Sequence, residues 1–170
     1  RSNTGAFWHW YLLDPSYFYL LDALNLLNGN TPGHILHPGI TVHLLNTFLI
    51  WFTGIFTSNS VQHLVLTNPE QYLLFLSNVF IALNAMALGL VGFVGRQAFG
   101  TWLPAIVCQL APFMSSIVLK HAFIPKPESL LVFSTCLLIT LTLCSRSRTP
   151  LIAKHETLAI CFGIVGGFII

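Results

Sequence analysis

Residues 72–95 read YLLFLSNVFIALNAMALGLVGFVG, a run that contains no charged side chain and stops at Arg96. A helix that crosses the hydrocarbon core of a bilayer needs about 20 mostly apolar residues, so this run is long enough to span a membrane. Charged residues make up 7% of the chain and the mean hydropathy is +0.77, whereas an ordinary soluble domain is about 25% charged. The sequence therefore predicts an all-α integral membrane protein.

Three more apolar stretches follow and predict further spanning helices. With residues 72–95 as the first span, the others cover 102–119, 128–144 and 157–170. The span at 128–144 follows Pro125 and Pro127, which mark a helix start because proline is tolerated in the first turn and not in the interior. Residues 58–170 thus form a predicted membrane domain of about four transmembrane helices.

Basic residues in the loops set the predicted orientation. Two spans separate Arg96 from the basic group after residue 144, so both lie on the same side of the membrane. Basic loops concentrate on the cytoplasmic side, and the larger group defines it. The cytoplasmic group is Arg96, Arg146, Arg148 and Lys154, against Lys120 and Lys126 on the outer side, where Glu128 also lies.

Residues 1–57 differ in pattern and predict an external loop with two interfacial helices. Between Asp22 and Glu70 the chain has no charged residue. The segment Tyr11–Leu27 repeats leucine at helical spacing but is interrupted by polar residues, which is typical of an amphipathic helix lying in the interface. We expect Asp22 and Asn25 to line the face of this helix that meets water.

The second of these segments, Ile40–Phe56, is long enough to attempt a crossing, yet polar residues recur in it at roughly helical spacing. If it spans, Asp14 and Glu128 face opposite sides of the membrane. If it is interfacial, which we expect, both face outward. We interpret His43 as a polar residue satisfied by its neighbours or as an interfacial anchor, with axial ligation of a haem or pigment as the alternative.

Composition narrows the classes of function. The basic residues form no face that could follow a phosphate backbone, so nucleic acid is not an expected partner. The four cysteines lie in apolar segments without CxxC spacing, and we expect free thiols. The aromatic residues near the N-terminus predict an interfacial belt; they are Trp8, Trp10, Tyr11, Tyr17 and Tyr19.

Four short marks, taken in order, resemble the C-type (GT-C) membrane glycosyltransferases. The resemblance is narrower to the protein-mannosyltransferase and aminoarabinose-transferase-like group. The marks are Asp14 with the Tyr-rich segment that runs to Gly29, His37-Pro38-Gly39 heading an apolar helix, RQAFG at 96–100, and PKPE at 125–128. Many relatives have Asp-Glu where this chain has Asp14-Pro15, and a second proline where it has Gly39.

The resemblance implies a role for each of these polar residues. In the family the opening aspartate is a general base or orienting carboxylate, and the sugar arrives on a polyprenyl phosphate; here this residue is Asp14. His37 takes the position near the donor phosphate or a bound divalent metal, and His34 lies one helical turn before it. We also assign Lys126 and Glu128, on the outer side, to binding of the substrate and the donor phosphate.

The chemistry is consistent with these roles, and structural alternatives stand beside them. An attacking hydroxyl or amine must lose a proton to a base, and a departing phosphate needs cationic or hydrogen-bonding partners. Asp14 before Pro15 is equally a good N-cap. His37 can be a turn residue, Glu128 a helix cap, and Lys126 a snorkelling interfacial residue.

The sequence thus predicts part of a polytopic glycosyltransferase of a bacterial inner membrane, acting on the non-cytoplasmic face. The alternative is a non-catalytic membrane subunit of a larger complex, derived from such an enzyme. A transporter is a distant third, because no paired discontinuous helices occur. The chain starts at Arg1 and stops inside an apolar stretch, so we expect a longer polypeptide.

Overall fold

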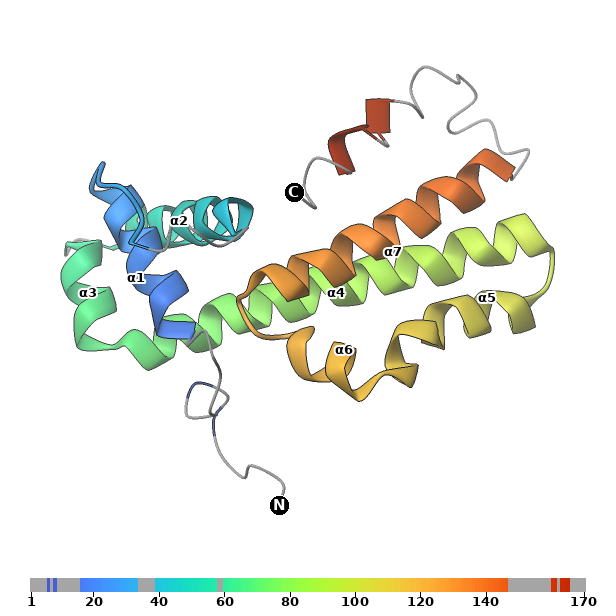
Figure 1. The fold of residues 1–170 in the computed structure, drawn as a ribbon, viewed down its shortest axis with the longest axis horizontal. Coiled ribbons are helices and arrows are strands. Elements are labelled where there is room, and N and C mark those ends of the chain that lie inside the picture. The colour runs from blue at the N-terminus through green and yellow to red at the C-terminus, as the bar shows by residue number, and fades with distance from the viewer. Residues whose placement is uncertain are drawn as a thin grey trace. The chain divides into compact units, whose positions relative to one another are not determined.

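The computed structural model describes residues 6, 8, 16–33, 39–57, 60–146, 160, 161 and 163–165. All regular secondary structure in this part of the chain is helical, which confirms the predicted all-α class (Figure 1). The elements are α1 (Ser16–Leu27), α2 (Ile40–Gly54), α3 (Val61–Thr67), α4 (Pro69–Phe99), α5 (Trp102–Leu110), the 3₁₀ helix η2 (Ala111–Met114), α6 (Ser116–His121) and α7 (Pro127–Arg146).

The chain divides into two compact units, and the division falls inside α4. Unit 1 extends to Val79 and also includes Ile124–Pro127. Unit 2 comprises Phe80–Phe123 and the chain from Glu128 onward. The predicted boundary after residue 57 concerned position relative to the membrane, and it stays a prediction.

Among the helices that the structure describes, two, α4 and α7, are long and apolar enough to cross a membrane. They contain the spans predicted at 72–95 and 128–144. From Phe80 onward α4 lies beside α7, with Ala87, Val91 and Cys136 forming a buried cluster between them (Figure 1). Gly100, with φ of +73°, follows the end of α4 in the left-handed conformation that terminates helices, and its N–H donates to the Arg96 carbonyl.

The span predicted at 102–119 is not one continuous helix. It is broken into α5, η2 and α6. Pro112 explains the break, because a proline removes one backbone donor and its ring clashes with the preceding turn. Ser115 is then extended, and its hydroxyl accepts a hydrogen bond from the Val118 N–H to begin α6. Most of the fourth predicted span, 157–170, lies outside the described residues.

Two glycines of α4 allow α5 to pack closely against it. A Cβ added at Gly95 would lie 3.2 Å from the Ala105 Cβ, and one added at Gly92 would lie 2.8 Å from the Gln109 side chain. Small residues spaced one turn apart are a common device for close helix packing in membranes. The broken segment is therefore held on α4 along α5.

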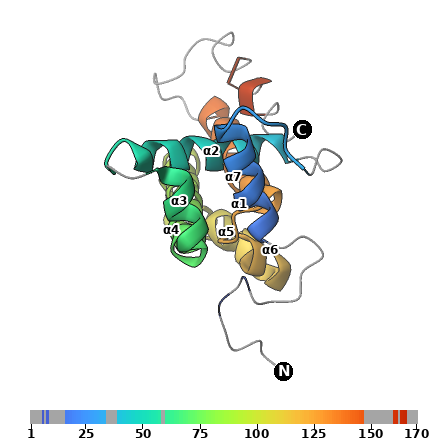
Figure 2. The ribbon, with the colours of Figure 1, turned by 90° about the vertical axis from the view of Figure 1, so that its left-hand side faces the viewer.

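In unit 1, α1 crosses α2 and the two pack tightly (Figure 2). Tyr19 stacks on His43 with ring centroids 5.3 Å apart, and one turn further along both helices the Thr47 hydroxyl donates to the Ala23 carbonyl at 3.1 Å. Ala23 is completely buried, and its small side chain leaves room for this approach. The crossing forms the core of unit 1.

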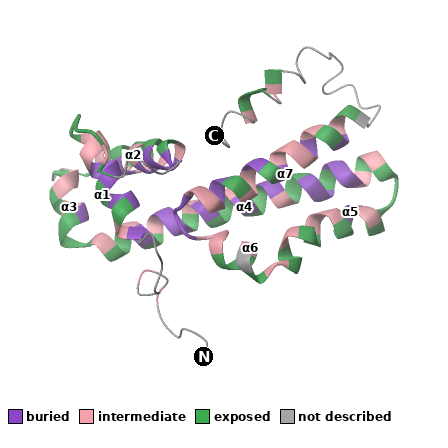
Figure 3. Cartoon of the chain, viewed as in Figure 1, coloured by how far each residue is buried: buried purple, intermediate pink, exposed green. Residues whose placement is uncertain are grey.

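α2 exposes one face and buries the other, and its exposed face is more apolar than that of a helix in a water-soluble protein (Figure 3). The buried face contains Val42, His43, Asn46 and Ile50. The exposed face is made of large apolar side chains, which are Ile40, Leu44, Phe48, Trp51 and Phe52. With 15 residues, α2 is shorter than the roughly 20 that a crossing requires, which is consistent with the interfacial arrangement we expect.

We predict that Gly54→Ala destabilises the protein while Gly89→Ala does not. A Cβ on Gly54 would overlap Cγ2 of Val61, and overpacking of this kind costs about 1–3 kcal/mol. Nothing lies within 4 Å of a Cβ added to Gly89, and alanine in a helix interior gains about 0.5–1 kcal/mol over glycine. Thermal unfolding of both variants in detergent compares them. Equal stability of the two would show that α3 does not pack on the end of α2 as described.

Candidate functional site

Three of the five predicted site residues, Asp14, His34 and His37, lie outside the described residues. The support for their predicted roles therefore comes from the sequence alone. The other two, Lys126 and Glu128, flank the start of α7 at Pro127. What the structure adds is the surroundings of these two and of the residues on either side of positions 34–38.

Lys126 is only 3% exposed, and its backbone N–H donates to the Ile124 carbonyl at 2.7 Å. A snorkelling lysine keeps its charged end in water, so that interpretation is wrong for Lys126. A buried ammonium needs polar or anionic partners. The position is compatible with the predicted contact to a phosphate.

Glu128 lies in the first turn of α7 and is half-buried. The N-terminal turn of a helix has N–H groups without intrahelical partners and a partial positive charge, which a carboxylate stabilises by about 0.3–1 kcal/mol. This agrees with its interpretation as a residue of the helix start. It does not exclude a further role, because one oxygen, Oε2, is buried without a hydrogen bond to any described residue.

The most pronounced polar feature of unit 1 is a pair that sequence analysis missed, Asp22 with His43. Oδ2 of Asp22 lies 3.8 Å from Nε2 of His43, and their side chains are 6% and 2% exposed. The expectation that Asp22 faces water is wrong. A buried carboxylate needs hydrogen-bonding or charged partners. Asp22 has such a partner in the Gly33 N–H, which donates to Oδ1 at 2.7 Å.

His43 is buried beside Asp22 and stacks on Tyr19; its nearest ring nitrogen lies 3.8 Å from the Asp22 carboxylate, a distance of electrostatic contact and longer than a hydrogen bond. Asn46, one turn further along α2, is fully buried. Its side chain makes no hydrogen bond to any described residue. The interior face of α2 is thus polar at two successive turns.

The Asp22–His43 pair lies beside both residues that flank the segment 34–38. Gly33, before it, donates its N–H to Asp22. Gly39, after it, lies so close that an added Cβ would be 3.5 Å from Nε2 of His43 and 3.4 Å from both Tyr19 and Pro127. The segment that carries His34 and His37 therefore begins and ends next to one buried pair.

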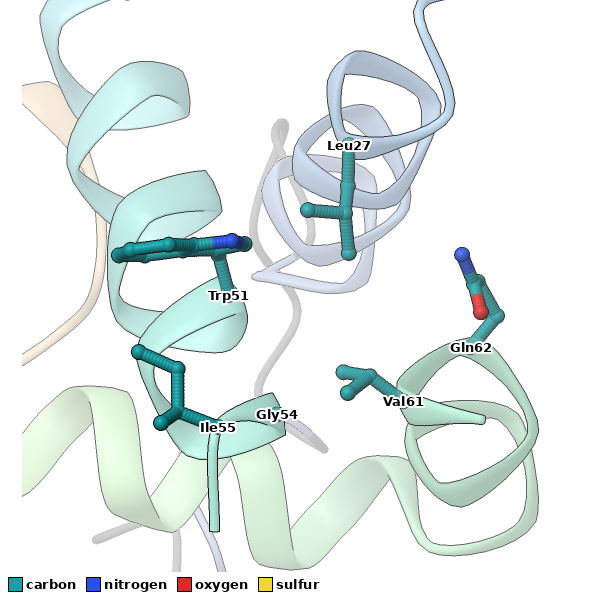
Figure 4. Close-up of a pocket in the computed structure, with 6 residues that line it drawn as sticks. All are labelled: Leu27, Trp51, Gly54, Ile55, Val61 and Gln62. Atoms are coloured by element: carbon teal, nitrogen blue, oxygen red, sulfur yellow. The ribbon is translucent and has the colours of Figure 1, made fainter. Parts of the chain in front are cut away.

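Unit 1 also contains an open groove of about 350 Å³, whose lining does not include this pair (Figure 4). It is lined by Leu27, Trp51, Gly54, Ile55, Val61 and Gln62. The Gln62 amide donates to Oδ1 of Asn28 at 2.8 Å, so the rim is already hydrogen-bonded. The walls are mainly apolar.

Tyr17, at the start of α1, has a pKa raised above its usual value of 10.0. The larger cause is desolvation of the phenol, and the smaller is the negative charge of Glu70, which disfavours the phenolate. Tyr17 is therefore a neutral hydroxyl at physiological pH. The predicted role of Tyr17 in an interfacial belt stays a prediction.

Within the described part of the chain, no three His, Cys, Asp or Glu side chains gather closely enough to hold a metal. The predicted metal contact at His37 stays a prediction. The four cysteines are not joined in disulfides, as predicted; they are Cys108, Cys136, Cys144 and Cys161. No disulfide contributes to this fold.

The chain matches no protein-family model, no curated protein and no solved structure. The resemblance to the C-type glycosyltransferases therefore depends on the residues quoted for it.

We predict that Asp22→Ala lowers the free energy of unfolding by about 1–3 kcal/mol, the range for leaving buried partners unsatisfied. The substitution removes the acceptor for the Gly33 N–H and the carboxylate beside His43. Asp22→Asn is expected to lose less, because its oxygen can still accept from Gly33. Chemical unfolding of the solubilised variants measures both. An Asp22→Ala protein as stable as the wild type would contradict the anchoring role.

Proposed function

We propose that this chain is a part of a bacterial inner-membrane glycosyltransferase, which transfers a sugar from a polyprenyl-phosphate donor to an acceptor on the non-cytoplasmic face. The observation that supports it best is the position of the segment 34–38 between two residues that lie beside Asp22 and His43. The segment carries two histidines. Gly33, before it, is hydrogen-bonded to the buried Asp22 carboxylate, and Gly39, after it, lies beside the His43 imidazole. A binding site for a charged group needs its flanking residues held in place in this way.

Insertion in a membrane is supported by the surfaces of α4 and α7. Only 33% of the apolar window of each helix is buried, and the exposed positions of α4 include Ile81, Met86, Leu90 and Phe93. An apolar surface of this extent is unfavourable in water. Hydrocarbon is a suitable solvent for it, because the backbone groups of both helices are already paired internally.

In the proposed reaction, an acceptor hydroxyl attacks the anomeric carbon of the donor sugar. The new glycosidic bond forms as the bond to the lipid phosphate oxygen breaks, and the acceptor proton passes to the carboxylate of Asp14. The phosphate leaves with the lipid and carries the negative charge. His34, His37 and Lys126 are proposed to stabilise that charge, and Glu128 to line the substrate site.

The orientation can be tested by labelling. We predict that single cysteines at positions 14 and 128, in a background without the four native cysteines, both react with a membrane-impermeant maleimide applied from outside. The reason is that α2, being short and apolar on its exposed face, lies in the interface and leaves both positions on the outer side. A cysteine at position 96 is the control and should react only after permeabilisation. Labelling of only one of the two positions would disprove this arrangement.

The reaction can be tested with one near-isosteric substitution in the intact protein. We predict that Asp14→Asn slows sugar release from a polyprenyl-phosphate donor by about 10²–10⁴-fold, the usual contribution of a general base. Its stability should be unchanged, because asparagine caps a helix about as well as aspartate.

Glu70→Gln serves as the matched control, since Glu70 is an exposed carboxylate at the start of α4. It should keep wild-type activity. Wild-type activity in Asp14→Asn would leave Asp14 as a helix cap. An intact wild-type protein without any transfer activity would favour the alternative, a non-catalytic membrane subunit.

A further inference from the structure

A pocket of about 230 Å³ lies in unit 2, between helix α7 and the broken segment that follows α5; Figure 1 shows these elements. Pro112 and Val118, on either side of the break at Ser115, form one wall, and α7 forms the other. The residues that line the pocket are Pro112, Val118, Leu131, Val132, Thr135 and Cys136. The break in the helix therefore supplies one wall of the pocket.

The walls of this pocket are apolar. Thr135 is the residue of the lining that has a hydroxyl, and this hydroxyl donates to the Leu131 carbonyl at 2.7 Å. Pro112 has no backbone N–H, and a buried thiol such as that of Cys136 behaves as a small apolar group. A cavity holds water only when it offers about two to four polar partners, and apolar cavities of about 150 Å³ in other proteins stay dry and bind hydrocarbon instead. The walls therefore fit a hydrocarbon ligand.

The pocket lies at a defined depth along α7. Nδ2 of Asn84 donates to the Ser129 hydroxyl at 3.0 Å, and the amide and the hydroxyl each donate to the Ala122 carbonyl at 2.7 Å. These three residues, the Asn84 cluster, hold the end of α6 level with the start of α7. At about 1.5 Å per residue, Leu131 and Cys136 lie about 3 and 10 Å beyond Ser129. Half of a hydrocarbon core is about 15 Å thick, so a pocket that begins at the membrane surface stays within one leaflet.

The pocket opens on the outside of unit 2. Leu131 and Thr135, on its α7 wall, are exposed. Phe113 and Leu119, each next to a residue of the other wall, are exposed apolar side chains as well. In a bilayer, such an opening is surrounded by lipid chains.

Basic residues lie at the surface end of the pocket. α6 ends with Lys120 and His121. His121 follows Val118 by one turn and therefore lies on the same face of α6, and Lys120 is exposed. Glu128, the one acidic residue in the described part of unit 2, is half-buried. The exposed charge at this end is therefore positive, and basic residues at a membrane surface attract anionic lipid headgroups.

We propose that unit 2 binds one anionic phospholipid, with an acyl chain in the pocket and the phosphate near Lys120 and His121. A phospholipid supplies a negative charge at the surface and hydrocarbon directly below it, in the order in which this site presents basic residues and apolar walls. A side chain of another protein would supply only the hydrocarbon. The inference rests on the insertion of α7 in a bilayer, and it does not depend on sugar transfer.

The test uses the intact protein in phosphatidylcholine vesicles that contain a small fraction of phosphatidylglycerol with a photoreactive diazirine in one acyl chain. After illumination, mass spectrometry locates the adducts. We expect adducts on Val118 and on residues 131–136 that unlabelled phosphatidylglycerol suppresses and that unlabelled phosphatidylcholine suppresses much less. Adducts on the rest of the lipid-facing surface should not saturate, because bulk lipid exchanges there.

Thr135→Trp should reduce the saturable adducts about tenfold, the factor that an overpacked contact typically costs, because the indole takes the space of the chain. Thr142→Trp is the matched control. Thr142 is also exposed on α7, two turns further along, and donates to the Leu138 carbonyl at 2.8 Å, but it does not line the pocket. This variant should be labelled as the wild type is.

Lys120→Gln should weaken the preference for phosphatidylglycerol over phosphatidylcholine about fivefold, the usual contribution of one basic residue near an anionic surface. Arg96→Gln removes the same charge in the last turn of α4. It is the control for Lys120→Gln and should keep the preference.

The proposal is overturned if the adducts at the pocket do not saturate, if folded Thr135→Trp is labelled as the wild type is, if Thr142→Trp loses as much, or if Lys120→Gln keeps the full preference. It is also overturned if an unlabelled polyprenyl phosphate competes more strongly than phosphatidylglycerol, because the pocket would then hold the donor of the proposed reaction. Circular dichroism checks that each variant is folded. Labelling of the wild type alone can disprove the proposal, so a variant that fails to fold does not rescue it.

Discussion

The contact between Asp22 and His43 carries much of the organisation of unit 1. It joins α1 to α2, and through Gly33 it fixes the return of the chain between them. The pair is buried in a region of sequence without other charges, where the effective dielectric is low and an unpaired carboxylate would be strongly destabilising. The fold therefore has to bring these residues together. Tyr19, Gly39 and Pro127 then pack around the place where they meet.

The same constraint explains the Asn84 cluster in unit 2. Along apolar helices, hydrogen bonds between polar side chains and backbone carbonyls are specific, because few competing partners exist. Asn84, Ser129 and Ala122 are hydrogen-bonded to one another and hold the turn that leads into α7. Apolar packing around Ala87 and Val91 is less directional. These hydrogen bonds thus define the positions of the helices more precisely than the apolar contacts do.

These polar clusters are separate from the exposed surfaces, which are apolar along α2, α4 and α7. A protein with this distribution has a polar interior and an apolar exterior at several points, the reverse of a water-soluble domain. In the proposed enzyme, the apolar exterior would face lipid, and the buried polar groups would hold neighbouring backbone in place.

Much of the fold follows from local properties of the sequence. Length and apolar composition were enough to place the helices around 72–95 and 128–144, and the position of the cysteines inside apolar segments was enough to expect free thiols. The break in the predicted span 102–119 had a visible signal in Pro112, whose effect on a helix interior is local. An isolated aspartate and an isolated histidine within an uncharged region were the signal for a buried pair, but spacing along the chain does not say which residues will meet.

Which of these residues meet is decided by the packing of one helix on another, as α1 packs on α2. Asp22 reaches His43 because Ala23 and Thr47 let the helices approach closely, and Asn84 reaches Ser129 because α7 lies against α4. In both cases the partner is distant in sequence, and its identity depends on how complete helices cross. Helical periodicity specifies which face of one helix is apolar. It carries no information about which polar residue of another helix will face it, because that is fixed only when the side chains of both are packed together.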